Sequence, residues 1–380
     1  MDRTALVVGA GIGGLTAAIA LRRDGWRPLV LERAERFEPV GAGISVFPNA
    51  VHCLRGLGLT ERIDAVPALH VSGGLHNWRG EPLISADIGV LDEHFGAPLL
   101  LVHRAALHEL LLGALEQDDV RLGASVDGVE PDADGVTVRL ADGRTERGAL
   151  LIGADGLRST VRASVIGDGA PRYAGYLAWR GLAEREATEA PIGEFWGAGA
   201  VFGVIPLPGG LVYWFGTKRV PAGGQDTPEQ RKAEALAMFA DWQPSIPALV
   251  DATPVDGILR NDICDRTPRR GWSRGRVTLL GDAAHPMTPH LGQGACQAIE
   301  DAAVLGECLS EQDSVVGALA DYERRRYPRT AMVVRRSRLA GRLSQLRNPV
   351  LRAGRDAVLR RISVAGQLRQ LAAVLRMPVS

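Results

Sequence analysis

The start of the chain alternates between apolar runs and a glycine-rich turn. Thr4–Val8 is a mostly apolar run of strand length that stops at glycines. Leu15–Leu21 has the apolar residues of a buried helix, and Pro28–Leu31 is a second short apolar run. We therefore expect a strand, a helix and a parallel strand, because a helix that connects two parallel strands forms a βαβ unit.

Further segments follow the same two periodicities. Within Val71–Ile88, short strand-like runs surround a turn at Trp78–Gly80. Arg104–Leu115 carries its leucines on one helical face. Val136–Leu140 and Ala149–Ile152 are predicted to be strands joined through the Asp-Gly turn at positions 142 and 143.

Aromatic residues become frequent after residue 173. Val201–Leu207 and Leu211–Phe215 are typical of strands in this region, which extends to about Leu259. Val277–Leu280 is again an apolar run of the kind found in buried strands, and a helix is predicted at Ala295–Leu305. Glycine-rich motifs lie on both sides of the aromatic region, so we expect one domain to be inserted into another.

The composition is that of an ordinary globular protein with two lobes. Hydrophobic residues make up 46% and charged residues 23% of the 380 positions. The 44 basic and 44 acidic residues cancel, so we expect neither nucleic acid nor a membrane as a partner. The four cysteines form no CxxC pair, and the first apolar run is too short for a signal sequence. Both features favour a cytoplasmic protein.

The last part of the chain is rich in arginine. From Val334 onward Asp356 is the only acidic residue. A basic amphipathic helix of this kind can contact a membrane or a partner. A solvated helix that packs across both lobes is the simpler interpretation, and it is the one that we expect.

The first turn reads Gly-Ala-Gly-Ile-Gly-Gly between the strand and the helix. Gly9 allows a tight turn, Gly11 lets the backbone approach a pyrophosphate, and Gly14 allows the helix to pack closely on the strand. Glu32 ends the next strand, where a carboxylate accepts hydrogen bonds from ribose hydroxyls. The pattern predicts a dinucleotide site but does not separate FAD from NAD. A glycine turn with a surface glutamate is the alternative.

Two more motifs narrow the choice. Residues 153–162 read Gly-Ala-Asp-Gly-Leu-Arg-Ser-Thr-Val-Arg after an apolar strand, and Asp155 is the third of them. Residues 280–286 read Leu-Gly-Asp-Ala-Ala-His-Pro around Asp282, and Pro-His-Leu-Gly-Gln-Gly follows at 289–294, before a helix. Amides at the start of that helix have no partner within it. Taken singly, these pieces fit an N-cap or a tight loop; together they favour a flavin.

The three motifs resemble the fingerprints of the class A flavoprotein monooxygenases, the family of p-hydroxybenzoate, salicylate and urate hydroxylases. Val40–Ile44, Pro48–Asn49, Arg104 and Tyr173–Tyr176 also have counterparts there, so the resemblance covers nearly the whole chain. It implies FAD as the cofactor. The residues that it implies for FAD binding are Gly9, Gly11, Gly13, Gly14, Glu32, Arg33, Arg104, Asp155, Asp282, Gly292, Gly294 and Ala295.

Several of these residues have distinct implied roles. Asp282 accepts hydrogen bonds from the ribityl hydroxyls, and the amides around Gly292–Gly294 stabilise negative charge on the reduced flavin. Arg104 reaches the pyrophosphate or ribityl region, with a salt bridge at the helix start as the alternative. Asp155 acts by holding Arg158 or a loop amide, with a simple turn residue as the alternative.

The implied fold is α/β, with a Rossmann-like FAD-binding domain, an inserted substrate domain rich in β-sheet, and C-terminal helices. The FAD-binding domain is expected at residues 1–70, 98–172 and 265–330. The substrate domain is expected at 71–97 and 173–264, and the C-terminal helical segment at 331–380. A monomer or a homodimer is expected.

The implied reaction uses NAD(P)H and molecular oxygen. NAD(P)H reduces the flavin, oxygen adds to form a flavin 4a-hydroperoxide, and one oxygen atom is transferred to a small aromatic or polyketide-like substrate. The sequence has no second strand–GxGxxG–helix unit, so the nicotinamide cofactor has no Rossmann site of its own. No metal site is expected, because no metal-spaced cluster of His or Cys is present.

Three residues are candidates for contact with the substrate. Tyr213 lies on a strand where relatives hold a polar residue near the substrate, although a tyrosine there can equally be core filler. Arg180 can bind a carboxylate or phenolate with both ends of its guanidinium, or form an ordinary ion pair. His290 stands next to Leu-Gly-Gln-Gly, close to the implied flavin, and we expect it to deprotonate or position the substrate because histidine titrates near neutrality. Urate hydroxylases carry a substrate-facing Arg at the position that we align with Ala200, which argues against urate.

Other functions share parts of this pattern. Alkene epoxidation is the first alternative, because epoxidases of the superfamily carry the same three motifs. A flavin oxidase or dehydrogenase without oxygen transfer is the second, and a non-catalytic FAD-binding protein is the third. A halogenase is disfavoured, because no WxWxIP-like segment is present.

Overall fold

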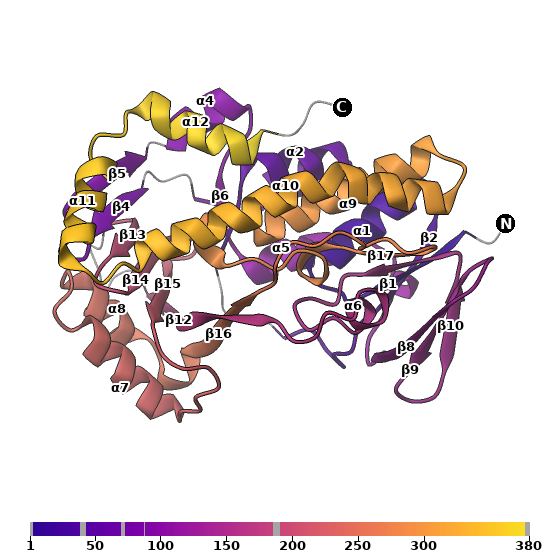
Figure 1. Cartoon of the computed structure of the whole chain (residues 1–380), viewed down its shortest axis with the longest axis horizontal. Coiled ribbons are helices and arrows are strands. Elements are labelled where there is room, and N and C mark those ends of the chain that lie inside the picture. The colour runs from indigo at the N-terminus through magenta and orange to yellow at the C-terminus, as the bar shows by residue number, and fades with distance from the viewer. Residues whose placement is uncertain (1–2, 39–42, 70–72, 87, 185–190, 377–380) are drawn as a thin grey trace.

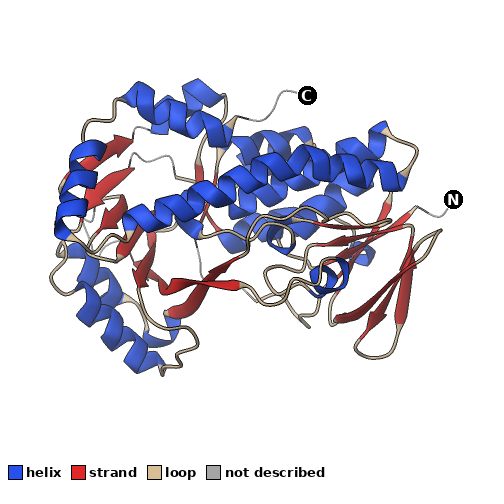
Figure 2. Ribbon diagram, in the orientation of Figure 1, coloured by secondary structure: helices blue, strands red, loops and turns tan. Residues whose placement is uncertain are grey.

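The computed structural model describes residues 3–38, 43–69, 73–86, 88–184 and 191–376. A parallel sheet lies towards one end of the molecule and a larger sheet towards the other (Figures 1 and 2). A long helix, α10 (Val315–Ser344), runs across both regions. Helix α10 thus spans the two sheet regions, in addition to the chain segments that connect the strands of one sheet to those of the other.

The five-stranded sheet is parallel throughout and has the order β17-β11-β1-β2-β7. Every residue of its central strand β1 is buried, as expected for a strand covered on both faces. Helix α1 (Ile12–Arg23) follows β1 directly and packs alongside α9 (Gly294–Glu311). The strands are β1 (Thr4–Val8), β2 (Arg27–Leu31), β7 (Val120–Arg121), β11 (Leu150–Gly153) and β17 (Val277–Leu279).

The seven-stranded sheet has the order β16-β12-β15-β14-β13-β4-β5. One face packs on helices α7 (Pro228–Phe239) and α8 (Ser245–Ala252) in a core that includes Trp179, Phe202 and Trp214. The other face carries Tyr213, which lies against the backbone of Gly43. The strands are β4 (Gly73–Asn77), β5 (Pro82–Ala86), β12 (Arg172–Glu184), β13 (Gly193–Trp196), β14 (Val201–Leu207), β15 (Leu211–Lys218) and β16 (Leu259–Asp265).

Smaller elements complete the chain. A two-stranded ribbon of β3 (Gly43–Val46) and β6 (Leu100–His103) lies between the two large sheets, and β8 (Val126–Pro131), β9 (Val136–Leu140) and β10 (Thr145–Gly148) form a separate antiparallel sheet. The remaining helices are α2 (Pro48–Gly56), α3 (Thr60–Asp64), α4 (Ile88–Phe95), α5 (Arg104–Leu112), α6 (Thr160–Val165), α11 (Pro349–Leu359) and α12 (Val364–Leu375).

Most predicted elements are present, and one connection was wrong. The Asp142–Gly143 turn joins β9 to β10 in a hairpin, and not to the next apolar run, which is the parallel strand β11. The short strand β10 was missed because Thr145–Gly148 is polar and only its last residue is buried. The predicted boundary after residue 330 falls inside α10. No helix in the described ranges is long and apolar enough to cross a membrane.

Candidate active site

The glycine turn after β1 has the geometry that the sequence predicts. Gly9 has φ +103°, and a Cβ placed there would lie 2.6 Å from the carbonyl oxygen of Ala154. A Cβ on Gly14 would lie 1.9 Å from the carbonyl oxygen of Gly9. At Gly11, by contrast, a Cβ would meet no described atom within 4 Å. Gly9 and Gly14 therefore let the backbone pack tightly, whereas Gly11 leaves open space in front of α1.

Glu32 holds this turn in place. One of its carboxylate oxygens accepts a hydrogen bond from the amide of Ala10 at 2.8 Å, and the other from the amide of Ala34 at 3.0 Å. The carboxylate thus bridges the first glycine turn and the end of β2. Glu32 follows directly after β2, as the sequence predicts, and its contact with ribose hydroxyls stays a prediction.

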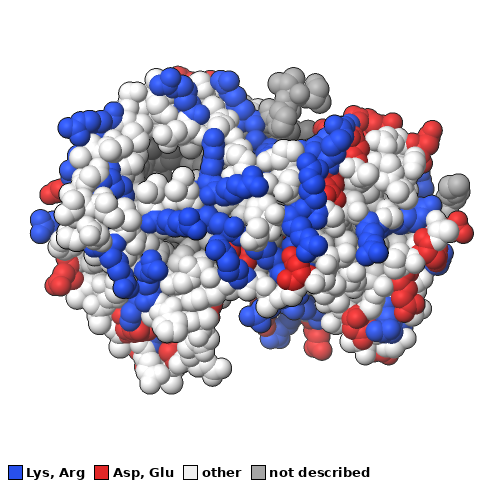
Figure 3. Space-filling model, viewed as in Figure 1, with Lys and Arg blue, Asp and Glu red and all other residues white. Residues whose placement is uncertain are grey.

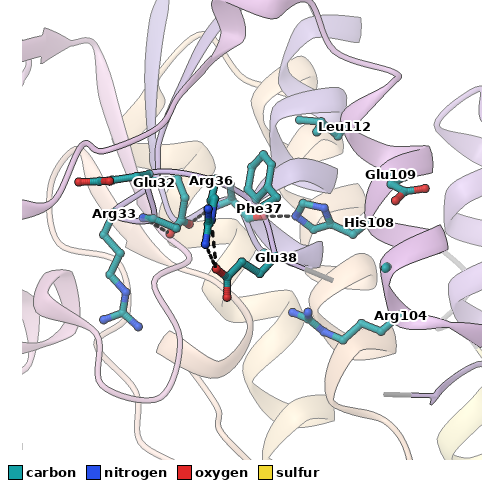
Figure 4. A pocket seen from close by; sticks show the side chains of 14 residues that line it. Glu32, Arg33, Arg36, Phe37, Glu38, Arg104, His108, Glu109 and Leu112 are labelled. Atoms are coloured by element: carbon teal, nitrogen blue, oxygen red, sulfur yellow. Dashed lines mark hydrogen bonds and ion pairs between the residues drawn. The ribbon is translucent and has the colours of Figure 1, made fainter. Parts of the chain in front are cut away.

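A cavity of about 950 Å³ opens beside the turn (Figure 4). His108 contacts the carbonyl oxygen of Ala10 through Nε2 at 2.8 Å, and its ring meets Phe37 edge to face. Arg33 and Arg104 line the same cavity, and neither makes a hydrogen bond or an ion pair within the described ranges. Burial and the nearby charge of Arg180 lower the pKa of Arg104. Two cations without a partner among the described residues, beside a helix start without a side-chain cap, are suited to an anion.

The second motif supports the turn from behind. Asp155 accepts hydrogen bonds from the Ser159 hydroxyl at 2.5 Å and from the Thr160 amide at 2.7 Å, so it caps α6. Burial raises the pKa of its carboxyl group. Asp155 thus holds amides in the first turn of α6, and it makes no hydrogen bond or ion pair with Arg158 among the described residues. The backbone at Asp155 packs on Gly9.

A buried arginine that the sequence did not single out links the second and third motifs. Arg162 is 1% exposed, donates to the carbonyl oxygens of Ala283 and Ala284 at 2.7 and 2.8 Å, and pairs with Asp168. These bonds fix the loop that carries Asp282. The side chain of Asp282 is exposed and has no hydrogen bond with described residues, although both of its neighbours are buried.

The loop before α9 leaves backbone amides free. Gly292 has φ +62°, and a Cβ there would lie 2.9 Å from the ring of Phe47. Next to it, Gly294 begins α9, where a Cβ would meet no described atom within 4 Å. The N-cap residue Gln293 makes no side-chain cap, and the first turn contains no acidic residue. The positive end of α9 thus faces open space, as does that of α1.

A buried ionic network lies behind this loop. Arg326 donates to Glu300 and Asp301, each at 2.6 Å, and Arg329 binds Glu300 with both ends of its guanidinium. Burial raises the pKa of Asp301, but His285 and Arg326 outweigh it and hold the pKa at about 2. The same carboxylate accepts from the amide of Gly281, so the network positions the third motif.

The network also reaches the start of α9. Glu300 accepts a hydrogen bond from Asn49 at 2.5 Å, and Asn49 in turn donates to Gln293 at 3.0 Å. The Nε2 of His285 lies 2.5 Å from a carboxylate oxygen of Asp301, so this contact helps to fix the loop that carries the third motif. The sequence did not reveal Glu300, Asp301 or Arg326 as a unit, because the helices that carry them are separate in the chain.

The candidate substrate residues lie on the face of the larger sheet away from α7 and α8. Tyr176 and Arg180 are four positions apart on β12 and therefore point to one face. Tyr213 pairs with Leu182 across the sheet and shares that face. Arg180 and the Tyr213 hydroxyl make no hydrogen bond in the described part of the chain. His290 joins this face from the loop before α9, because its Nε2 lies 2.7 Å from the Tyr176 hydroxyl.

One expectation about this face was wrong, and another stays a prediction. Ala200 is fully buried in the core that packs on α7 and α8, so this residue does not face the proposed substrate region, and the expectation against urate stays a prediction. His290 does not titrate near neutrality, because burial lowers its pKa to about 4. A Cβ on Gly341 of α10 would lie 2.6 Å from its ring, which shows how closely the imidazole is packed. His290 is therefore neutral at pH 7.

Comparison with known proteins gives this geometry a family. The sequence profile described as "FAD binding domain" matches residues 2–337. The chain belongs to the class A flavoprotein monooxygenases. The aurachin C monooxygenase/isomerase of Stigmatella aurantiaca is 43% identical over 366 residues, which is 95% of this chain and 94% of that protein. A 3-amino-4-hydroxybenzoate 2-monooxygenase of Streptomyces platensis is 39% identical, over 88% of this chain and 87% of its own length.

Solved structures agree with the sequence relatives. The crystal structure of Klebsiella pneumoniae HpxO complexed with FAD and uric acid has a TM-score of 0.92 and 34% identity, over 98% of this chain and 96% of that one. Like its relatives, the chain is an FAD-dependent monooxygenase. The comparisons do not favour the epoxidase and oxidase alternatives.

The described residues fit FAD. Two uncapped helix ends with open glycine positions lie side by side, since a Cβ on Gly13 would lie 2.7 Å from Leu280 and 3.0 Å from Ala298. The exposed carboxylate of Asp282 and the buried, unpartnered Nε2 of Gln293 are further polar groups free for a ligand. The Val40–Ala42 part of the family resemblance lies outside the described residues, which contain no cluster suited to a metal ion.

The low pKa of His290 leads to a prediction about how the free energy of unfolding depends on pH. An unfolded chain takes up a proton at this residue below about pH 6.5, whereas the folded protein does so only near pH 4. Stability should therefore be lost as the pH falls from 6.5 to 4. Between pH 7 and pH 4.5, the free energy of unfolding should fall by about 2 kcal/mol less in His290→Gln than in the wild type. Urea unfolding at the two pH values measures this; the exposed His52→Gln is the control, and equal losses in all three proteins would contradict the assignment.

Proposed function

We propose that the enzyme hydroxylates a small aromatic or polyketide-like compound, with NAD(P)H and molecular oxygen as cosubstrates. The observation that carries this proposal is the contact between His290 and Tyr176. It brings the loop before α9, which family resemblance assigns to the flavin, against the sheet face of Arg180 and Tyr213. A substrate on that face is next to the proposed flavin site.

The family assignment makes FAD the group that supplies the redox chemistry and the activation of oxygen. The chain's own residues would bind and orient it: the amides of Gly11 and of the α1 turn hold the pyrophosphate, and Glu32 and Arg104 hold the adenosine side and the diphosphate. Amides of Gly294 and Ala295 would face the redox ring and stabilise negative charge on it. No nucleophilic side chain is needed.

Apolar side chains close the proposed substrate region against water. Phe47, Ile205 and Leu371 belong to one cluster that joins the β3–β6 ribbon, the larger sheet and α12. Exclusion of water protects a reactive oxygen species from wasteful breakdown. In our proposal Arg180 binds a carboxylate, phenolate or carbonyl of the substrate, Tyr213 orients it through its hydroxyl, and neutral His290 positions it by hydrogen bonding.

The reaction class is tested with labelled oxygen. The purified holoenzyme is incubated with NADH or NADPH and a panel of hydroxybenzoates, quinolines and aromatic polyketides, and stimulated NAD(P)H oxidation identifies substrates. Under ¹⁸O₂ the product of a hydroxylase carries a single labelled atom in a new hydroxyl group. An unlabelled oxidised product would refute oxygen transfer, and a labelled epoxide would refute hydroxylation.

Substitution of the proposed substrate residues should affect binding more than turnover. We expect Arg180→Gln and Tyr213→Phe each to raise KM about tenfold, because each removes a partly buried hydrogen bond to the substrate. FAD content should stay that of the wild type. Steady-state kinetics measure KM and kcat, and exposed Arg219→Gln, just after β15, is the control. An unchanged KM in both variants would place the substrate elsewhere.

A further inference from the structure

Two charged side chains of helix α11, Arg355 and Asp356, are directed towards the protein. Arg355 is only 8% exposed and donates to the carbonyl oxygens of Leu343 and Ser344 at 2.9 and 3.3 Å. Its guanidinium lies over the ring of Trp196, 5.1 Å from the centroid, and pairs with the half-buried Asp356. Arg355 and Asp356 are therefore engaged in contacts within the protein and are not available to a partner.

The outward side of α11 is apolar. Val350, Leu351 and Val358 are 76%, 57% and 63% exposed, and Leu351 and Val358 are seven positions apart on one side of the helix. Two exposed leucines of α10, Leu339 and Leu343, are four positions apart and precede this helix. We call these five residues the α10–α11 face. Surface helices of globular proteins normally have the opposite arrangement.

The segment that carries this face is rich in arginine. From Val334 onward the chain has eleven arginines against one acid, Asp356, and that acid is already paired. Figure 3 shows basic side chains spread over the part of the surface formed by α10 and the helices after it. The neutral balance of the whole chain hides this local charge, which is why the sequence led us to expect no membrane partner. Exposed arginines without a hydrogen bond among the described residues include Arg335, Arg336, Arg342 and Arg347.

The charge decides between possible partners. A second copy docked through the same face would bring arginines against arginines, which opposes association. Helices that combine exposed apolar side chains with arginines bind in the headgroup region of anionic bilayers. We propose that the α10–α11 face binds an anionic lipid surface, with the apolar side chains inserted and the arginines among the headgroups.

Vesicle flotation of the holoenzyme tests the proposal. The probes are vesicles of phosphatidylcholine alone and vesicles of phosphatidylcholine and phosphatidylglycerol in equal amounts. We expect binding to the anionic vesicles that weakens in high salt, and little binding to the neutral ones. The triple variant Val350→Ser, Leu351→Ser, Val358→Ser should bind the anionic vesicles about tenfold more weakly or worse.

Matched variants make the result specific. Val316→Ser removes a valine that is 47% exposed at the other end of α10, and this variant should bind like the wild type. Arg335→Glu with Arg342→Glu should weaken binding independently of the apolar substitutions. Bound FAD and the circular dichroism spectrum should be unchanged in all variants, because every altered side chain is exposed.

Four results would overturn the proposal. They are no binding to the anionic vesicles at low salt, equal binding to neutral vesicles, an effect of Val316→Ser as large as that of the triple variant, and a concentration-dependent dimer that the triple variant abolishes. The last would assign the face to a second copy of the chain.

Discussion

Replacing Gly11 with valine should abolish FAD binding while the protein stays folded. The backbone at Gly11 is extended, with φ −73°, and a Cβ there meets no described protein atom within 4 Å. Valine is therefore tolerated by the fold, apart from about 1 kcal/mol at most for a poorer helix N-cap. It fills the open space in front of α1, where the pyrophosphate would lie. We expect the Kd for FAD to rise at least about a hundredfold.

Flavin fluorescence titration of the apoprotein measures this Kd, and thermal unfolding of the apoprotein checks the fold. Gly56→Val is the matched control, because a Cβ on Gly56 also meets no atom within 4 Å but lies at the end of α2. Its Kd should equal that of the wild type. Normal FAD affinity in Gly11→Val would show that the pyrophosphate does not lie before α1.

Replacing Arg326 with leucine should cause the largest loss of stability. Arg326 is 2% exposed and donates to Glu300, Asp301 and the side chain of Gln297. Its removal leaves two buried carboxylates short of a partner, and breaking a buried ion pair in this way costs about 3–5 kcal/mol. This is a large part of the roughly 5–15 kcal/mol that stabilises a typical domain.

Chemical unfolding of the holoenzyme measures this loss, and a nearby residue supplies the control. Arg324, two positions before Arg326, has a side chain that is 72% exposed and pairs with Asp321, so Arg324→Leu should change stability by at most about 1 kcal/mol. Similar losses of unfolding free energy in the two variants would show that the buried ion pairs of Arg326 contribute no more to stability than an exposed pair does.

The sequence was a good guide to the parts of the site that local backbone geometry determines. Strand β1 and the glycines after it were predicted correctly, because a tight turn and a helix packed on a strand each require glycine at a fixed spacing. The loop at Asp282 and the start of α9 were predicted for the same reason. In these segments each residue's neighbours in space are also its neighbours in the chain.

The parts that the sequence did not reveal depend on contacts between distant segments. Arg162 binds carbonyl groups more than a hundred positions away, and its motif alone does not show its target. The placement of Ala200 has a related cause, because this residue lies in the loop between β13 and β14 and its burial depends on packing against the distant helices α7 and α8. His290 was expected to titrate near neutrality because that is the ordinary behaviour of a histidine side chain. A single sequence does not show that α10 buries this ring and lowers its pKa.

Arg329 ties the end of the chain to its interior. It donates to the carbonyl oxygens of Val374 and Arg376 at 2.8 and 2.9 Å while it holds Glu300. A chain shortened before α12 would leave those donors unmatched and remove Leu368 and Leu371, which α12 packs against Leu99 and Leu101 beside the proposed substrate region. Expression designs should therefore keep the polypeptide intact at least through residue 376 and place any purification tag at the amino terminus.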